Sequence, residues 1–330
     1  MPGLYILSSV FIVEVYTFCY SVSMKTTKKP IPLFFSLIVL GIVLVLWLNP
    51  VRTSNPFMSI LYITGITVSL SFLFALISGD YSWTDRLWST MPVVFAWIYA
   101  LYGGLTLPLL VATILVTLWG ARLTFNFARR GGYTTSEDYR WLIIHKKINN
   151  EVLWQIFNLL FIALYQQILF IAFTSPLYLL SLHGAQEMIL PLWLAALLFL
   201  AFLAIETIAD QQQYTFQQSK YGLLPRRPEW AEQYKRGFRS SGFFARSRHP
   251  NYFGELGVWF SIYIFSSLAV GNFLNWSLVG PLALTMLFSI STIFTESITA
   301  KKYEAYHQYK KQASAIIFKF SVVDTQKRFC

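Results

Sequence analysis

The composition of the 330-residue chain is that of a membrane protein. Hydrophobic residues make up 55% of it and aromatic residues 18%, whereas charged residues make up only 12%, about half of the roughly 25% usual in soluble domains. This deficit of charge excludes a disordered chain and argues against a soluble fold. It predicts an all-α, polytopic membrane helix bundle.

The charge that remains is basic, with 26 Lys and Arg against 15 Asp and Glu, a formal net charge of +11. In a membrane protein such an excess follows the positive-inside rule, so we expect contact with membrane lipids and no nucleic-acid partner. The two cysteines, Cys19 and Cys330, and four scattered histidines lack metal-ligand spacing. We therefore expect neither a disulfide framework nor a bound metal.

About nine apolar runs are predicted as transmembrane helices, each of which needs roughly 20 mostly apolar residues. In chain order they are 4–20, 31–49, 57–78, 88–102, 105–127, 152–174, 188–209, 252–271 and 277–300. The first carries Glu14 and has no basic leader or cleavage site, so we interpret it as a weak span rather than a signal peptide. The run 176–183, which begins at Pro176, is too short to span and is predicted at the interface.

Threading these spans alternately through the bilayer places 25 of the 26 Lys and Arg on one side and leaves only Arg52 on the other. The positive-inside rule makes the first side cytoplasmic, together with the C-terminus. The longest polar stretches, 129–151, 210–251 and 301–330, also fall there. We therefore predict a cofactor site at the cytoplasmic mouth of a multi-pass protein, in a bacterial inner membrane or the endoplasmic reticulum.

The densest group of polar residues, 236–255, leads into the span that begins near Tyr252. Guanidinium groups at a helix entrance favour phosphate, either of a cofactor or of lipid headgroups. Asn251 and Glu255 lie one turn apart on one helical face at membrane depth, where polar groups are costly and usually functional. The basic residues that precede them include Arg239, Arg246, Arg248 and His249.

Two other helix ends carry polar pairs at the same spacing. Glu206 and Asp210 close the span 188–209, and Arg122 and Asn126 lie one turn inside the end of the span 105–127. Helix capping or water exposure is the simpler interpretation of the acidic pair, and snorkelling explains the arginines at 129–130. Arg122 with Asn126 is harder to explain in that way, so this pair is predicted to be functional.

Two further groups have a structural and a functional interpretation. Asp85, next to Arg86, is a local ion pair or a catalytic acid. Tyr306 and Tyr309 share one face of a basic tail helix, which suits either the membrane surface or rings that stack on a nucleotide. Soluble-type dinucleotide, phosphate-loop, zinc-protease and serine-elbow motifs are absent from the sequence.

The stretch 246–255, Arg-Ser-Arg-His-Pro-Asn-Tyr-Phe-Gly-Glu, resembles the superfamily of steroid 5α-reductases, sterol reductases and isoprenylcysteine carboxyl methyltransferases. It is most similar to the DUF1295 branch, which shares Ser-Trp-x-Asp-Arg-Leu-Trp at 82–88 and the Trp-Gly-x-Arg-Leu and Glu-Asp-Tyr-Arg motifs within 119–140. The resemblance covers residues from about 80 to the end. It implies a membrane catalytic domain over 80–330, preceded by N-terminal transmembrane helices of unknown role in 1–79.

The resemblance implies an enzyme that holds NADPH at the cytoplasmic mouth and reduces a carbon–carbon double bond, often one conjugated to a ketone. By alignment with the family motifs, Asn251 and Glu255 would contact the nicotinamide end of the cofactor. Glu206 and Asp210 would line the cofactor cavity, and Arg122, Arg130 and Arg239 would contact the cofactor. Together with the patterns above, the predicted cofactor-binding set is Arg122, Asn126, Arg130, Glu206, Asp210, Arg239, Arg246, Arg248, His249, Asn251, Tyr252, Tyr306 and Tyr309.

One position departs from the reductases, which carry a tyrosine as carbonyl donor three residues before the first arginine. This chain has Trp119 there, and an indole can donate a hydrogen bond but cannot deliver a proton. We therefore expect the acid to be Asp85 or Tyr102, and Glu255 completes the predicted catalytic set.

Three functions are compatible with these features. The first is NADPH-dependent reduction of a steroid-like, sterol-like or enoyl-lipid substrate that enters from the bilayer. The second is a methyltransferase that uses S-adenosylmethionine, because that branch shares Arg-His-Pro-x-Tyr at 248–252. The third is a non-catalytic lipid-binding protein, which would have little reason to bury Glu206, Asp210 and Glu255.

Overall fold

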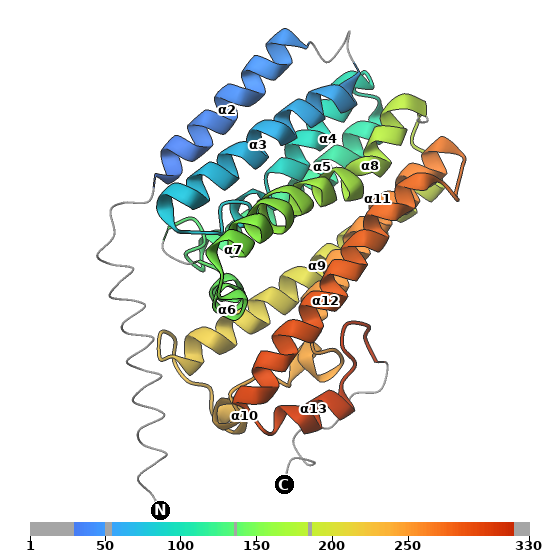
Figure 1. Cartoon of the computed structure of the whole chain (residues 1–330). Helices are drawn as coiled ribbons and strands as arrows, with labels where there is room; N and C mark the ends of the chain where they lie inside the picture. Colours follow the sequence, from blue (N-terminus) through green and yellow to red (C-terminus); the bar gives the residue numbers. More distant parts are fainter. Residues whose placement is uncertain (1–29, 50–54, 135–136, 184–186, 320–330) are drawn as a thin grey trace, which may run out of the picture.

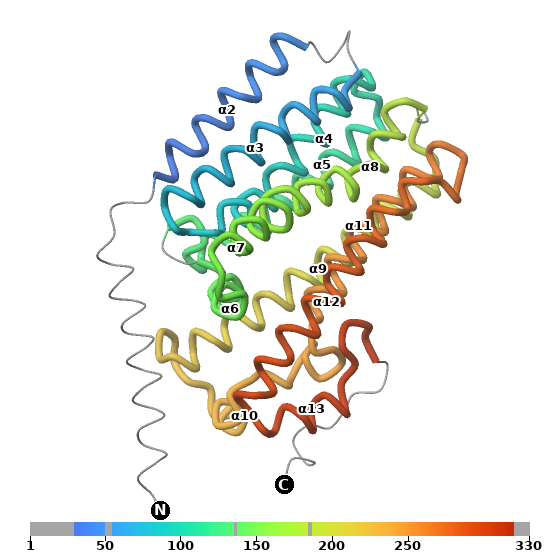
Figure 2. Tube along the Cα trace, in the orientation of Figure 1, coloured from blue at the N-terminus to red at the C-terminus, as the bar shows by residue number. Residues whose placement is uncertain are grey.

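The computed structural model describes residues 30–49, 55–134, 137–183 and 187–319, and this part of the chain is helical (Figures 1 and 2). The helices before the first long loop are α2 (Ile31–Leu48), α3 (Pro56–Ser78), the 3-10 turn η1 (Asp85–Leu87), α4 (Met91–Tyr102), α5 (Leu107–Ala128) and α6 (Tyr139–Ile148). They are followed by α7 (Glu151–Phe157), the π-helix η2 (Asn158–Tyr165), α8 (Gln166–His183), α9 (Leu190–Lys220), η3 (Pro228–Trp230) and α10 (Ala231–Arg236). The last are η4 (Gly242–Ala245), α11 (Pro250–Val270), η5 (Trp276–Leu278), α12 (Val279–Lys302) and α13 (Tyr306–Gln312).

Within the described ranges, seven helices are long and apolar enough to cross a membrane. They are Ile31–Leu48, Pro56–Ser78, Leu107–Ala128, Glu151–His183, Leu190–Lys220, Pro250–Val270 and Trp276–Lys302. The all-α membrane bundle is therefore confirmed, but the count of nine is not. The predicted span 88–102 shrinks to the 12-residue α4, because 85–90 forms a separate turn. The predicted span 4–20 lies outside the described residues.

Proline and glycine explain several helix ends. Proline occupies the first turn of α3, α5, α9 and α11, where its missing N–H costs nothing. The helices α3 and α11 end at Gly79 and Gly271, whose positive φ angles of 66° and 73° close the last turn. These signals explain why most predicted boundaries agree with the structure to within a few residues.

The prediction that the sixth run, 152–174, ends at 174 and that 176–183 is a separate interfacial segment is wrong. The helices α7, η2 and α8 form one continuous span, Glu151–His183. Pro176 lies inside α8 and removes the donor to the carbonyl of Ala172 without ending the helix. A Cβ at Gly280 would collide with that same carbonyl oxygen, so α12 packs closely against α8 at the carbonyl that lacks its helical donor.

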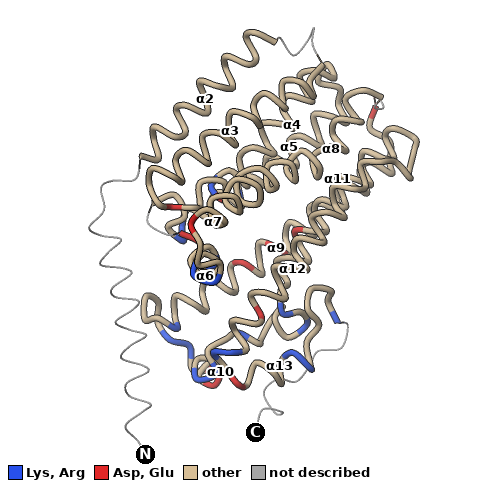
Figure 3. The backbone as a smooth tube through the Cα atoms, viewed as in Figure 1, with Lys and Arg blue, Asp and Glu red and all other residues tan. Residues whose placement is uncertain are grey.

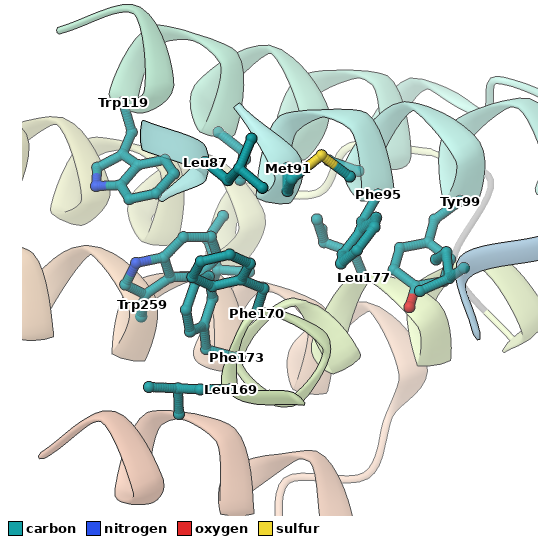
Figure 4. Close-up of a cluster of buried hydrophobic side chains, with 14 of the residues drawn as sticks. Leu87, Met91, Phe95, Tyr99, Trp119, Leu169, Phe170, Phe173, Leu177 and Trp259 are labelled. Atoms are coloured by element: carbon teal, nitrogen blue, oxygen red, sulfur yellow. The ribbon is translucent and has the colours of Figure 1, made fainter. Parts of the chain in front are cut away.

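The helices form two groups (Figures 1 and 2). In one, α2, α3, α4, α5 and α8 lie side by side, and in the other, α9, α11 and α12 cross beside them. Helix α11 packs along α9 and also contacts α8 and α5. Aromatic rings fill the junction: Trp119 and Trp259 have centroids 4.8 Å apart, and Phe173 is 4.2 Å from Trp259 (Figure 4).

Charged residues are distributed unevenly along the bundle (Figure 3). In the described ranges, Lys and Arg lie toward the end where α3, α5, α9 and α12 finish, around α6, α10 and α13. We call this the basic end. The segregation agrees with the charge partition predicted from the sequence.

Candidate functional site

A buried arginine joins three helices near the basic end. Arg122 of α5 donates from Nη1 to Asp210 Oδ2 at 2.7 Å and from Nη2 to Glu206 Oε1, both on α9. Its Nη2 also lies 3.7 Å from Glu255 Oε2 on α11. All three carboxylates are buried, so one guanidinium compensates a group of charges that would be costly to bury alone.

Two indoles hold Glu255 from either side. Trp119 Nε1 donates to Oε2 at 2.9 Å, and Trp259 Nε1 donates to Oε1 at 3.0 Å. Because Trp119 is committed to this carboxylate, its N–H is not directed at a substrate. The departure from the reductase tyrosine therefore has a structural role in this chain.

A second layer of polar contacts surrounds Asp210. Asn126 Nδ2 donates to Asp210 Oδ2 at 2.8 Å, and Arg130 Nη2 lies 3.6 Å from Asp210 Oδ1. Arg129 donates to Asn126 Oδ1 and to Gln211 Oε1. The predicted pairs at helical spacing thus face one another across α5 and α9.

A glycine on α11 permits the close packing of α11 against α9. A Cβ on Gly254 of α11 would lie 2.7 Å from the backbone nitrogen of Glu206 on α9, closer than real Cβ atoms come. Because Gly254 directly precedes Glu255, the contact brings the Glu255 carboxylate against α9.

The cluster forms one end of a cavity of about 670 Å³, within the usual size of ligand sites. The polar residues that line it are Ser82, Asp85, Ser89, Asn126, Arg130, Glu137, Asp138, Tyr139, Arg140, Gln166, Glu206, Asp210, Asn251, Tyr252, Glu255 and Ser291. The apolar and aromatic part is lined by Trp88, Leu123, Phe127, Trp141, Ile144, Phe157, Phe161, Leu287, Phe288, Ile290 and Phe294. The cavity lining therefore combines charged and hydrophobic side chains.

Asp85 faces this cavity at a distance from the carboxylate cluster. Its Oδ2 accepts from Trp141 Nε1 at 2.8 Å. Burial raises the pKa of Asp85 to about 6; the nearby Asp138 carboxylate adds to the rise, and the Trp141 hydrogen bond and Arg140 oppose it. Arg86, predicted as its ion-pair partner, pairs instead with Asp80 at 2.7 Å.

Arg140 connects the Asp85 region to α12. It forms a two-pronged pair with Asp138, including Nη2 to Oδ2 at 2.6 Å, and its Nη1 donates to Ser291 Oγ at 2.9 Å. Asn251 and Tyr252 also line the cavity. The Tyr252 ring stacks on Phe288 with centroids 4.4 Å apart.

Arg248 and His249 hold the tail against α12. Arg248 Nε donates to Glu296 Oε1 at 2.6 Å, His249 Nε2 lies 3.1 Å from the same oxygen, and Lys310 Nζ lies 3.2 Å from Oε2. The backbone carbonyl of Ser314 accepts from the Arg248 N–H at 2.9 Å. Neither Arg248 nor His249 lines the large cavity, so their cofactor role stays a prediction.

Tyr306 and Tyr309 are also packed away from the cavity. Both are buried against Phe238, and Tyr309 donates its hydroxyl to the carbonyl of Phe244 at 2.5 Å. Burial raises the pKa of both tyrosines above the usual range. The geometry therefore shows a packing role, and stacking on a nucleotide stays untested.

Three other predicted residues lie elsewhere. Arg239 stacks on Trp230 beside a smaller cavity of about 260 Å³, and burial lowers its pKa to about 10. Arg246 accepts through its backbone carbonyl from Lys319 N at 3.1 Å. Tyr102 ends α4 at the opposite end from Asp85 and does not line the large cavity.

Sequence reasoning missed Trp141, Arg140, Trp259 and the aromatic residues of η2. Trp259 lies one turn after Glu255, a spacing that places the two side chains on one face of the helix. Arg140 ends the Glu-Asp-Tyr-Arg motif and Trp141 follows it, but both lie far in sequence from Asp85. Among the described residues, no group of three or more His, Cys, Asp or Glu could hold a metal ion.

Comparison with known proteins gives a family but no activity. The profile described as "Protein of unknown function (DUF1295)" matches residues 71–313. The chain is similar to the uncharacterized protein C594.04c of Schizosaccharomyces pombe, with 32% identity over 277 residues, which are 78% of each chain. No solved structure matches the chain.

Proposed function

The chain belongs to the DUF1295 family, and we propose that it is an integral membrane oxidoreductase that uses NADPH to reduce a carbon–carbon double bond in a hydrophobic substrate. One observation carries the proposal. A single cavity of about 670 Å³ joins a buried carboxylate–guanidinium cluster, a separate acid at Asp85 and an apolar half. Such a cavity suits one polar and one hydrophobic reactant.

The residues present fit a nucleotide. Carboxylates of Glu206 and Asp210 and the amide of Asn126 are suited to sugar hydroxyl and carboxamide groups, and Glu206 Oε2 is buried without a hydrogen-bond donor among the described residues. Arg130, whose side chain is 42% exposed, lies at the edge of the cluster and is suited to a phosphate. NADPH, when bound, would supply a hydride.

The chain's own acid can complete the reduction. Asp85 is held by Trp141 and is protonated below about pH 6. A protonated Asp85 would donate a hydrogen bond to a carbonyl conjugated to the double bond and stabilise the negative charge that develops on its oxygen. A hydride supplied by the cofactor would add to the β-carbon while Asp85 passes its proton to the carbonyl oxygen. The enol that forms would gain a proton from solvent at the α-carbon and return its O–H proton to the Asp85 carboxylate, so that one hydride and one proton are added across the double bond.

The orientation follows from the charge distribution. We place the basic end and the C-terminus on the cytoplasmic side, so that the carboxylate cluster faces the compartment that contains NADPH. The host membrane is a bacterial inner membrane or the endoplasmic reticulum.

The acidic residues that line the cavity favour a second candidate, a methyltransferase that uses S-adenosylmethionine. Six acidic residues and two arginines line the cavity, which suits the cationic sulfonium of S-adenosylmethionine. The acids are Asp85, Glu137, Asp138, Glu206, Asp210 and Glu255, and the arginines are Arg130 and Arg140. Arg122 compensates part of this charge from behind, so we rank the methyltransferase second.

The test is a product-mass assay on protein in lipid nanodiscs. Membrane-soluble ring and chain enones are incubated with NADPH, and cytoplasmic-membrane lipid extracts with S-adenosylmethionine. We expect a product that is heavier by two hydrogens, with NADPH only, and much less of it with Asp85→Asn. Products heavier by one methylene, with S-adenosylmethionine only, would establish the second candidate. An assay without any product would contradict both and favour a lipid-binding protein.

A further inference from the structure

Two residues mark a lateral mouth of the cavity. Ile290 of α12 and Tyr139 of α6 both line the cavity, yet each is 53% exposed on the surface. They lie on two helices that the hydrogen bond from Arg140 to Ser291 joins at 2.9 Å.

The mouth faces hydrocarbon rather than water. Residues 279–295 of α12 contain no charged side chain, and α12 belongs to a membrane-spanning segment with little of its surface buried in the bundle. Met286, Ile290 and Ile293 are exposed along its outer side. An opening at Ile290 therefore lies among apolar, lipid-facing side chains.

The opposite wall is an aromatic ladder on η2 and its flanks. Phe157 stacks on Trp154 and on Phe161, with centroids 5.6 Å and 5.0 Å apart, and Phe161 stacks on Tyr165 at 5.3 Å. Phe157 and Phe161 line the cavity together with Leu287, Phe288 and Ile290 of α12. The widened turns of a π-helix often accompany functional sites, and here they place residues four apart in one stack.

We propose that this opening between η2–α6 and α12 is a portal through which the apolar chain or flat ring of a bilayer-dissolved substrate enters. The substrate lies along the aromatic ladder, with its carbonyl end toward Asp85. The inference rests on the proposed function for the chemistry of the reacting end, but the portal itself requires no cofactor. Ile290 is then a residue that limits which substrates enter.

The experiment uses a long-chain α,β-unsaturated ketone with a photoreactive diazirine near the end of its tail. The full-length protein in phosphatidylcholine nanodiscs is irradiated without NADPH, and labelled peptides are identified by mass spectrometry. The variant is Ile290→Trp, which fills the mouth. The matched control is Ile293→Trp on the same helix, at a position that is 71% exposed and does not line the cavity.

We expect labels in the peptides that contain Phe157, Phe161 and Leu287, a several-fold loss of these labels in Ile290→Trp and wild-type labelling in Ile293→Trp. If Ile290→Trp fails to fold, Leu287→Trp replaces it. Cavity labels that persist with a filled mouth, or labels confined to outer helix faces, would overturn the portal. NADPH binding is measured in parallel, so failure of the reductase proposal is seen separately from failure of the portal.

Discussion

Trp119 on α5 donates its indole N–H to Glu255 on α11 at 2.9 Å, at a distance of 136 residues along the chain. Trp119 stands at the position where the reductases that this chain resembles carry a tyrosine. It also fixes the carboxylate that Arg122 approaches, so the indole supports the site instead of acting on a substrate.

Removing that indole N–H should destabilise the protein. Trp119→Phe keeps an aromatic ring, although a smaller one, and leaves a buried carboxylate oxygen without this donor, at a cost of about 1–3 kcal/mol in the free energy of unfolding for the lost hydrogen bond. Denaturant unfolding in detergent measures it. Trp97→Phe is the control, because that indole donates to Thr117 at an exposed site; equal losses in both variants would contradict the assignment.

Arg122 should be the most sensitive residue of the cluster. Arg122→Met leaves three buried acids without their shared cation, and breaking such a pair costs about 3–5 kcal/mol. The exposed Lys235–Glu232 pair provides the control, since water and salt screen a surface pair and Lys235→Met should leave the free energy of unfolding nearly unchanged. Adding Glu206→Gln to Arg122→Met should recover part of the loss, and no recovery would argue against charge as its cause.

Asp85 should give turnover a pH dependence. The carboxyl pKa is raised from 3.8 to about 6, so the acid form is lost as the pH rises through about 6 and turnover falls with it. Asp85→Asn should lower kcat by roughly 10²–10⁴-fold and abolish this dependence. The free energy of unfolding should also fall as the pH rises. Between pH 3.8 and about 6, rising pH should destabilise wild type relative to Asp85→Asn, because the folded state binds the Asp85 proton more tightly than the unfolded state. A pH profile unchanged by the substitution would exclude Asp85 as the acid.

The tail tyrosines should act through packing. Tyr309→Phe removes the buried hydrogen bond to the carbonyl of Phe244 and should cost about 0.5–1.5 kcal/mol, with NADPH affinity unchanged. Arg130→Ala, at the cavity edge, should weaken NADPH binding and leave the free energy of unfolding nearly unchanged. Weaker NADPH binding by Tyr309→Phe without loss of stability would contradict a role in packing alone.

The sequence predicted the membrane bundle and much of the polar cluster because both depend on local spacing. Runs of apolar residues indicated the spans, and the pairs Arg122/Asn126 and Glu206/Asp210 could be placed on shared helical faces. Contacts made across the bundle could not be predicted in this way. The pairing of Arg248 with Glu296 and of Trp141 with Asp85 depends on how distant helices pack, and the continuation of α8 past Pro176 depends on cover by α12 at Gly280.

The most direct test is thermal unfolding of the detergent-solubilised protein titrated separately with NADPH, NADH and S-adenosylmethionine, since a ligand that binds only the folded state raises its stability by mass action. The reductase proposal predicts saturable stabilisation by NADPH that Asn251→Ala and Arg130→Ala weaken. Stabilisation by S-adenosylmethionine alone, or by none of the three, would contradict it.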